Sequence, residues 1–432
     1  MNVKNIYFIN LCLQLLINIC LHVRIMELDH GAHKAARLAL QDVISSMPDK
    51  VITNILDRLP LQDAVRTDVL SKNWRFKWTM LSQLVFDDNF FEYLSKTEGK
   101  DNHLRIISRF LLHLKGAITK FVLYIEKMRK FDDDDINHWI LFLSKNGIED
   151  LTFKLLDKTP FKLSTHLFSC LQLKHLKIYN CIFNPPPGFH GFPNLLSLEL
   201  YPNAEKSSDV GEFAIKCHLL EILKLRYILK AGRVKLVEIA KLKNLKILAL
   251  SLYDLDNKMI TSSDTIFELL DSLPKLQELY LNFQVCKLTE SGAKKNFSTA
   301  FPCLKALKLS MYLDNAIKLS CAFELIRSFP NMETLEITTY AGWYDSLAPP
   351  ICSPEVEYNT IGLLQLQSVF FTYSSGSENE VCLIKYLLAC SPFLKKIVMR
   401  PHSQLEPGKK LTFAMKLLEL HRASPVAEIK LF

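Results

Sequence analysis

The sequence predicts an α/β protein in which a small module of three helices precedes a long array of repeated strands with helices on their outer side. The first observation is the length of 432 residues, which exceeds an ordinary single core and favours several domains or an elongated repeat array. The second is a spacing of apolar residues that recurs along most of the chain. The third is a block of short apolar segments between residues 42 and 82.

The composition is that of a folded protein with a weakly basic surface. The chain is 49% hydrophobic and 23% charged, which is typical of globular proteins and not of disordered ones. The formal net charge is +8, but no run of Lys and Arg dominates and no nucleic-acid-binding motif is present. We therefore expect no nucleic-acid partner.

The block at 42–82 predicts three short helices. The first begins at Met47-Pro48-Asp49, because Pro suits the first helical turn and Asp49 complements the helix dipole. It ends at Leu59-Pro60, where a second helix begins and runs over 61–70. A third helix after Ser71 would carry Trp74 and Trp78 on one face.

About forty residues form a poor core by themselves, so the apolar side chains of this block need another surface. We expect Trp74 and Trp78 to pack on the rest of the chain. The remaining apolar anchors are expected to face another protein, where a central desolvated patch would carry the binding energy. This group is Met47, Pro48, Ile55, Leu59 and Pro60.

The motifs of this block resemble the F-box of plant F-box proteins. They are Ile44-Ser45-Ser46-Met47-Pro48-Asp49, Ile55-Leu56-Asp57-Arg58-Leu59-Pro60, Asp63-Ala64-Val65-Arg66-Thr67 and Val69-Leu70-Ser71-Lys72-Asn73-Trp74-Arg75. The departures are Met47 where Leu is common, which nearly conserves volume, and Asp68 where a small residue is common. The resemblance implies binding to the Skp-type adaptor of a cullin-based ubiquitin ligase. The implied adaptor-binding residues are Met47, Pro48, Val51, Ile52, Ile55, Leu56, Leu59, Pro60, Leu61 and Val65.

The rest of the chain repeats a pattern of three apolar anchors, φ-x-x-φ-x-φ. From residue 148 to residue 394 the first anchors step by 25, 22, 25, 25, 31, 28, 28, 34 and 28 residues, which is leucine-rich-repeat spacing. Each unit buries its anchors only by stacking on its neighbours, so we predict an irregular leucine-rich-repeat solenoid with a curved parallel sheet inside and helices outside. The copies start at residues 173, 195, 220, 245, 276, 304, 332, 366 and 394, with weaker ones at 81, 118, 148 and 426.

Several segments between the strands have helical periodicity. These are 132–144, 263–273 and 321–329. The four acids at 132–135 favour a helix N-terminus over a metal site, because adjacent carboxylates lack the alternating spacing of a calcium loop. Loops are expected at Pro185–Gly188, Tyr340–Tyr358 and Tyr373–Asn379.

The C-terminal residues, from about 360 to 432, are similar to the FBD segment of many plant F-box proteins. The resemblance includes LLQLQSVFFTYSSGSENEVCLIKYLLACSPFLKKIVM and the final HRASPVAEIKLF, with a helix expected at Val381–Cys390. The predicted organisation is an N-terminal extension at 1–40, the F-box at 41–80, the repeats at 81–358 and the FBD-like segment at 359–432.

Cysteine usage and the N-terminus bear on the compartment. The eleven Cys form no CxxC or zinc spacing, and most occupy apolar patterns, as Cys303 does, which favours a reducing compartment, the cytoplasm or nucleus. Ile6–Val23 resembles a signal-peptide core or a marginal membrane span. Its polar interruptions and the docking module that follows favour a dispensable extension, with Met26 as an alternative start.

No motif of an enzyme, metal site or cofactor site is present, so we expect a non-catalytic receptor subunit that needs no cofactor. Residues between the strand anchors point away from the core, and Tyr and Arg are typical interface residues. The candidate contacts to a protein substrate are Tyr179, Tyr201, Lys224, Arg226, Tyr280 and Lys308. Two alternatives are an interaction protein without a role in ubiquitination, and a membrane-anchored or secreted repeat receptor that depends on residues 6–23.

Overall fold

The computed structural model describes residues 47–70, 72–97, 103–125, 133–155, 160–202, 213–225, 236–251, 268–284, 303–313, 316–339, 364–403 and 405–432. The expectations on residues 6–23, Arg226 and Tyr340–Tyr358 lie outside these ranges. The chain forms two compact units, Met1–Tyr179 and Asn180–Phe432, and each is described here by itself.

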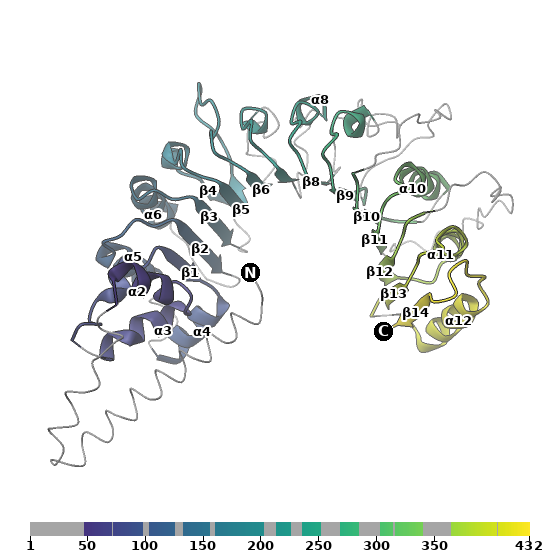
Figure 1. The fold of residues 1–432 in the computed structure, drawn as a ribbon, viewed down its shortest axis with the longest axis horizontal. Helices are drawn as coiled ribbons and strands as arrows, with labels where there is room; N and C mark the ends of the chain where they lie inside the picture. Colours follow the sequence, from purple (N-terminus) through teal and green to yellow (C-terminus); the bar gives the residue numbers. More distant parts are fainter. Residues whose placement is uncertain are drawn as a thin grey trace, which may run out of the picture. The chain divides into compact units, whose positions relative to one another are not determined.

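The first unit begins with helices and continues into a parallel sheet (Figure 1). Its strands follow the order β1-β2-β3-β5, with the short β4 beside β5. The helices are α2 (Asp49–Leu56), α3 (Leu61–Arg66), α4 (Asp88–Thr97), α5 (His103–His113) and α6 (Asp133–Lys145), with 3-10 helices η2 (Thr67–Val69), η3 (Lys77–Met80) and η5 (Thr165–Ser169). The strands are β1 (Gln83–Phe86), β2 (Lys120–Ile125), β3 (Asp150–Leu155), β4 (Phe161–Lys162) and β5 (His175–Ile182).

The predicted third helix of the first module is corrected by the structure. Residues 72–76 form turns, and only Lys77–Met80 form a 3-10 helix. Phe76 has φ +64, the left-handed conformation that an α-helix of L-residues does not propagate. Trp74 and Trp78 are therefore not on one continuous helix.

In the part of the chain that the structure describes, the second unit has nine strands joined by return segments. Its strands are parallel and ordered β6-β7-β8-β9-β10-β11-β12-β13-β14. They are β6 (Ser197–Pro202), β7 (Ile222–Leu225), β8 (Ile247–Ser251), β9 (Glu278–Asn282), β10 (Ala306–Met311), β11 (Thr334–Thr339), β12 (Ser368–Ser374), β13 (Lys396–Pro401) and β14 (Glu428–Leu431). Its described helices include α8 (Leu236–Ile239), α10 (Ala316–Ser328), α11 (Glu378–Cys390) and α12 (Pro407–Leu418).

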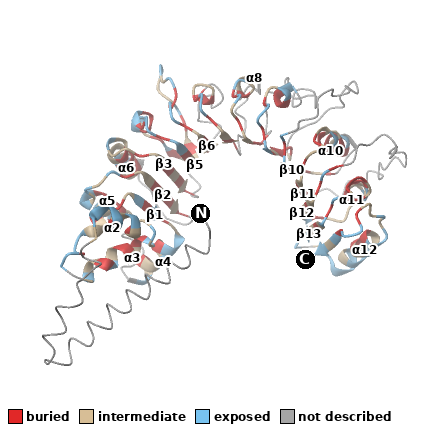
Figure 2. Cartoon of the chain, viewed as in Figure 1, coloured by how far each residue is buried: buried red, intermediate tan, exposed pale blue. Residues whose placement is uncertain are grey.

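The strand register confirms the repeat pattern. Every predicted copy coincides with a strand. Within each unit the second and third anchors of neighbouring copies pair, as Leu84 with Phe121 and Leu307 with Leu335 do. In every copy but the last, the anchors are buried and the residues between them are mostly more exposed (Figure 2). In the last copy Val426 and Leu431 are 68% and 38% exposed. Stacking of equivalent anchors continues through side chains, because the rings of Phe86, Phe121 and Phe153 follow one another at centroid distances of 5.6 Å.

The predicted return helices are confirmed where the structure describes them, as α6, α10 and α11. Of 263–273 only the last part is described, and residues 268–271 are helical. The expected loop at Tyr373–Asn379 is shorter than predicted, because β12 extends to Ser374 and α11 begins at Glu378. Cys303 also differs from its prediction, because it is exposed.

A capping box fixes the start of α11. The Ser377 hydroxyl accepts a hydrogen bond from the Glu380 backbone N–H, and the buried Glu380 carboxylate accepts from the backbone N–H groups of Ser375 and Gly376. Gly376 has φ +74, and a Cβ there would lie 2.9 Å from the Phe413 ring of α12. The turn therefore needs glycine both for its backbone conformation and for the close approach of α12.

Candidate functional site

One side of α2 presents apolar side chains to solvent. Pro48 occupies the N-cap position, and its carbonyl accepts the backbone N–H groups of Val51 and Ile52. Val51 is 42% exposed, and Ile55 lies four residues later, on the same side of the helix. Met47 and Ile55 are half-buried. This side of α2 is therefore an accessible apolar surface.

The turn after α2 and the start of α3 extend this surface. Pro60 is exposed, and Leu59 and Val65 are half-buried. We call the group Met47, Pro48, Val51, Ile55, Leu59, Pro60 and Val65 the apolar docking face. All seven belong to the adaptor-binding residues expected from the sequence.

The other three expected residues serve the module's own core. Ile52, Leu56 and Leu61 are 2%, 0% and 5% exposed. Helix periodicity alone could not separate Val51 and Ile55 from Ile52 and Leu56, because adjacent positions differ by only about 100° around the axis. Burial against the rest of the chain separates them: these three residues are covered in the chain by itself, and their contact with an adaptor stays a prediction.

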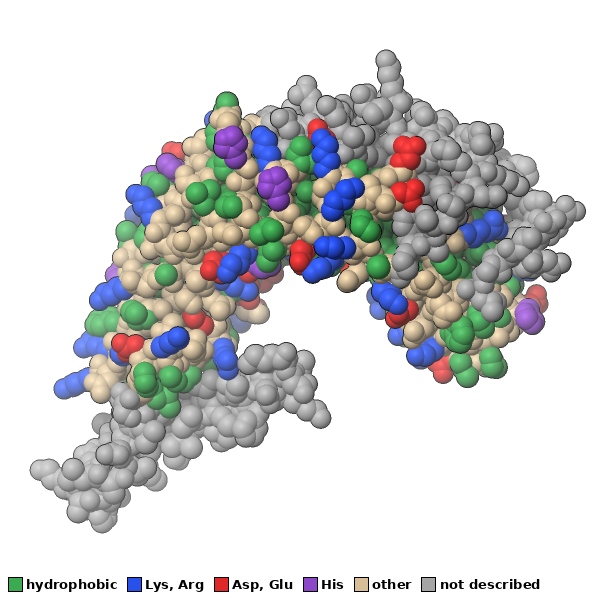
Figure 3. Space-filling view, turned by 45° about the horizontal axis from the view of Figure 1, so that its top comes forward, with side chains coloured by type: hydrophobic (Ala, Val, Ile, Leu, Met, Phe, Trp, Pro, Cys, Tyr) green, Lys and Arg blue, Asp and Glu red, His purple; other side chains and the backbone are tan. Residues whose placement is uncertain are grey.

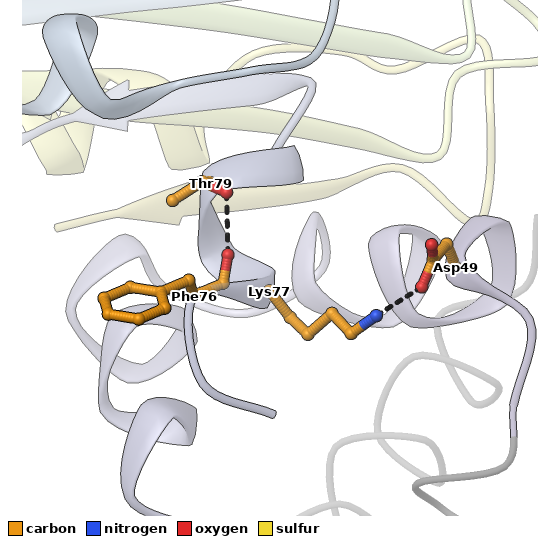
Figure 4. A network of polar contacts seen from close by, with 4 residues as sticks. All are labelled: Asp49, Phe76, Lys77 and Thr79. Atoms are coloured by element: carbon orange, nitrogen blue, oxygen red, sulfur yellow. Dashed lines mark hydrogen bonds and ion pairs between the residues drawn. The ribbon is translucent and has the colours of Figure 1, made fainter. Parts of the chain in front are cut away.

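The loop after α3 adds exposed apolar residues that sequence reasoning missed. Val69 and Phe76 are 55% and 57% exposed. The Asp68 carboxylate accepts the backbone N–H of Phe76, and the Phe76 carbonyl accepts the Thr79 hydroxyl at 2.7 Å. Figure 4 shows this turn beside the ion pair between Lys77 and Asp49, which joins η3 to α2. The one signal in the sequence was Asp68, an unusual residue at its motif position.

A carboxylate fastens the end of α2 to the start of the sheet. The Asp57 carboxylate accepts three hydrogen bonds, from the Ser82 N–H at 2.9 Å, the Gln83 N–H at 3.2 Å and the Ser82 hydroxyl at 2.5 Å. Ser82 directly precedes β1, and its carbonyl accepts the Thr119 N–H at the start of β2. The helical module and the first two strands are thus linked through polar contacts of one short segment.

Aromatic packing reinforces the same connection. The Trp78 ring meets the Phe110 ring of α5 edge-on at 5.4 Å, and the His113 ring at 6.1 Å. The Lys115 N–H after α5 donates to the Thr79 carbonyl at 2.8 Å. Trp74 is 4% exposed. Trp78 therefore packs on the first repeat, as the sequence predicted.

The candidate substrate residues that the structure describes lie on the strands, between the buried anchors. Tyr179, Tyr201, Lys224 and Tyr280 are half-buried, and Lys308 is exposed. Side chains of both charge signs lie next to one another on the surface drawn in Figure 3. Lys224 pairs with Glu199 of the neighbouring strand at 2.9 Å, and Lys308 pairs with Glu336 at 2.6 Å.

The buried thiols are poor nucleophiles. Burial raises the pKa of the Cys170 thiol to about 12 and that of Cys217 to about 11, and it raises the pKa of Cys181 further. Within the described ranges, no group of three or more His, Cys, Asp or Glu could hold a metal ion. No helix in the same ranges is long and apolar enough to cross a membrane.

Comparison with known proteins supports two segments of the chain directly. Residues 44–85 match the F-box domain. Residues 136–260 match the leucine-rich repeats of the FBD-associated F-box protein At5g56370. The two segments coincide with the helical module and with part of the strand array.

Relatives in Arabidopsis thaliana extend the similarity to nearly the whole chain. F-box/FBD/LRR-repeat protein At1g13570 is 29% identical over 418 residues, which cover 90% of this chain and 98% of the relative. The putative FBD-associated F-box protein At5g50270 is 25% identical and covers 85% of this chain and 99% of its own length. An F-box domain implies in general a Skp-type adaptor as partner, and its combination with leucine-rich repeats suggests an F-box substrate-recognition protein. The resemblance of this chain to plant F-box/leucine-rich-repeat proteins with a C-terminal FBD segment is thereby confirmed.

Proposed function

We propose that the chain is the substrate-recognition subunit of a cullin-based ubiquitin ligase of the SCF type. The apolar docking face would bind the Skp-type adaptor and through it the cullin, and the strand residues would bind a protein substrate. The observation that carries the proposal is the accessible apolar side of α2 and its following turn, within residues that match the F-box domain. An exposed face of this kind favours a protein partner over solvent.

The proposed role is non-catalytic. A ubiquitin-conjugating enzyme would supply the chemistry, and this chain would raise the local concentration of a substrate lysine near that enzyme. The Asp57 contacts and the Trp78 packing support this role, because a receptor that positions a substrate benefits from a stiff connection between its two binding surfaces. We place the complex in the cytoplasm or nucleus.

Co-purification with a recombinant Skp-type adaptor tests the proposal. The double variant Leu59→Ala, Pro60→Ala should abolish co-purification, since truncation of central interface anchors costs about 2 kcal/mol or more each. Leu112→Ala is the matched control, because Leu112 is an 80% exposed leucine on α5 of the same unit. Circular dichroism should show all three proteins folded.

The outcomes separate the proposal from its alternatives. Failure of the folded wild-type chain to bind the adaptor would contradict the proposal and favour a repeat protein that acts outside ubiquitination. If the double variant binds the adaptor as well as the wild type does, the apolar docking face is not the adaptor-binding surface. Affinity purification from plant cells under proteasome inhibition would then look for the substrate.

A further inference from the structure

The strand face of the first unit carries a row of three side chains, of which only Tyr179 is among the substrate candidates expected from the sequence. Tyr124 of β2 pairs in register with Lys154 of β3, and Lys154 pairs with Tyr179 of β5. The three residues therefore lie side by side on adjacent parallel strands, about 5 Å apart. We call Tyr124, Lys154 and Tyr179 the Tyr–Lys–Tyr row.

The lysine ammonium of this row lies between two aromatic rings. Lys154 Nζ is 4.1 Å from the centroid of the Tyr124 ring and 5.7 Å from that of Tyr179. Lys177 of β5 also approaches the Tyr179 ring, at 5.6 Å. Cation–π contacts hold an ammonium in place without neutralising its charge, because a ring carries a quadrupole and no net charge.

Two lysines on strands of the second unit are held differently. Lys224 and Lys308 each have a glutamate at the paired position of a neighbouring strand, and both form ion pairs with it. Lys154 has tyrosine at the paired position on both sides. A glutamate carboxylate neutralises Lys224 and Lys308 within the chain. The tyrosine rings do not neutralise Lys154, so its positive charge is available to attract an anionic group.

The acidic residues on this face lie at the other end of the strands. Among the described residues of β2, β3 and β5 and the residues just before them, the acids are Glu149 and Asp150. Glu149 pairs with Lys174 at 2.7 Å and Asp150 with Lys120 at 3.7 Å. Among the described residues of these strands, Lys154 therefore lies away from both acids.

We propose that the Tyr–Lys–Tyr row docks an acidic segment of the protein substrate. The inference rests on the proposed function and names the chemistry of its substrate. An Asp or Glu side chain would meet the Lys154 ammonium, and the neighbouring backbone would pack on the two tyrosine rings. Carboxylates fit better than phosphate groups, because the described part of this face offers lysine point charges and no Arg for bidentate recognition.

Fluorescence anisotropy of labelled peptides on the full-length chain tests the proposal. The probe is a fluorescein-labelled peptide of three Asp-Glu-Gly-Ser repeats, and its neutral counterpart has three Asn-Gln-Gly-Ser repeats. We expect the acidic peptide to bind at least about tenfold more tightly. Lys154→Glu should remove about tenfold of that affinity, and Lys154→Arg should restore most of it. Tyr124→Leu and Tyr179→Leu should each lose about threefold, since they release the ammonium from its ring contacts.

Lys385→Glu is the matched control, because Lys385 is an exposed lysine of α11 and its reversal changes the net charge equally. It should change affinity less than about twofold. The proposal is overturned if the acidic peptide does not bind, if the neutral peptide binds equally, or if Lys154→Glu and Lys385→Glu have equal effects. Preference for a phosphoserine peptide or a 12-nucleotide RNA would overturn it in favour of a phosphate site. Adaptor co-purification by the Lys154→Glu chain reports separately on the proposed ligase role.

Discussion

The Asp57 contacts predict that a single carboxylate holds the helical module against the first strand. The perturbation is Asp57→Ala, which leaves the Ser82 and Gln83 N–H groups and the Ser82 hydroxyl without their acceptor. A hydrogen bond to a charged group contributes about 1.5–3 kcal/mol, so the two backbone donors together give about 3 kcal/mol at the lower bound. Because Asp57 is half-buried, water can enter the space left by its side chain and accept hydrogen bonds from the freed donors. We expect this water to recover about 1 kcal/mol of the lost stability. We therefore expect local opening of this segment to become easier by about 2 kcal/mol.

Hydrogen exchange measured by mass spectrometry on the full chain tests this value. A change of about 2 kcal/mol corresponds to roughly 30-fold faster exchange in peptides that contain residues 80–86. Asp57→Asn should show a smaller change, because the amide oxygen still accepts from the backbone and the amide nitrogen can donate to the Ser82 hydroxyl.

Asp63→Ala is the control for removal of an aspartate from the same module. Asp63 forms an exposed i,i+3 pair with Arg66 at 3.4 Å, which contributes about 0.5 kcal/mol or less. Unchanged exchange at 80–86 in Asp57→Ala, or an equal change in Asp63→Ala, would refute the reasoning.

Three further predictions concern other parts of the chain. Burial raises the pKa of the Glu380 carboxyl in the folded protein, so the contribution of Glu380 to stability should fall as the pH rises above the pKa of about 4.3 that the carboxyl has in the unfolded chain. The thermal midpoint of the wild type, measured relative to that of Glu380→Gln, should therefore decrease between pH 5 and pH 8. A difference in midpoint that does not change with pH would contradict this. Phe76→Gly should relieve the left-handed backbone at φ +64 and leave stability unchanged or raised by up to about 1 kcal/mol, whereas β-branched Phe76→Val should lower it in the same thermal measurement. Iodoacetamide at pH 8 should modify the exposed Cys303 in the native chain but should modify the buried Cys170, Cys181 and Cys217 only after denaturation. Mass spectrometry of the tryptic peptides measures the labelling, and modification of the three buried thiols in the native chain would contradict the prediction.

The repeat array was predictable because stacking fixes both the type and the position of its residues. Anchors such as Leu248 and Leu279 pair directly across neighbouring strands, so each copy needs apolar residues at the same three positions. Even the weak copy around Phe121 and Leu123 follows this rule. Irregular spacing did not hide the pattern, because the length of the return segments varies whereas the spacing within each triplet of anchors is constant.

Features that depend on one local contact were not predictable from periodicity. The turn at Phe76 requires the Asp68 carboxylate to hold its backbone N–H. Helix α12 was missed because only Phe413 and Leu417 are buried, whereas the apolar Leu411 and Met415 are exposed. Such a helix has apolar residues on several sides and loses its periodic signal.

The candidate site was predictable in type and only partly in its residues. Periodicity predicted an apolar side of α2, but only the structure shows that Ile52 and Leu56 are buried whereas Val51 is exposed. The substrate candidates included Tyr179 and omitted Tyr124 and Lys154, because these two belong to the weaker copies of the repeat. Both occupy the same position relative to their anchors as Tyr179 does, so the positional rule would have found them.

The docking face and the Tyr–Lys–Tyr row belong to the same compact unit. Between them lie α2, the Asp57 contacts, and the in-register strands β1, β2, β3 and β5. The links in this path are hydrogen-bonded strand ladders, packed core and the hydrogen bonds to Asp57. Close-packed elements deform little without breaking. An acidic segment bound at Lys154 would therefore lie at a distance from the adaptor that the first unit alone determines. On this reasoning, the first unit sets where a substrate is held, and the strands of the second unit are left to determine which substrate is accepted.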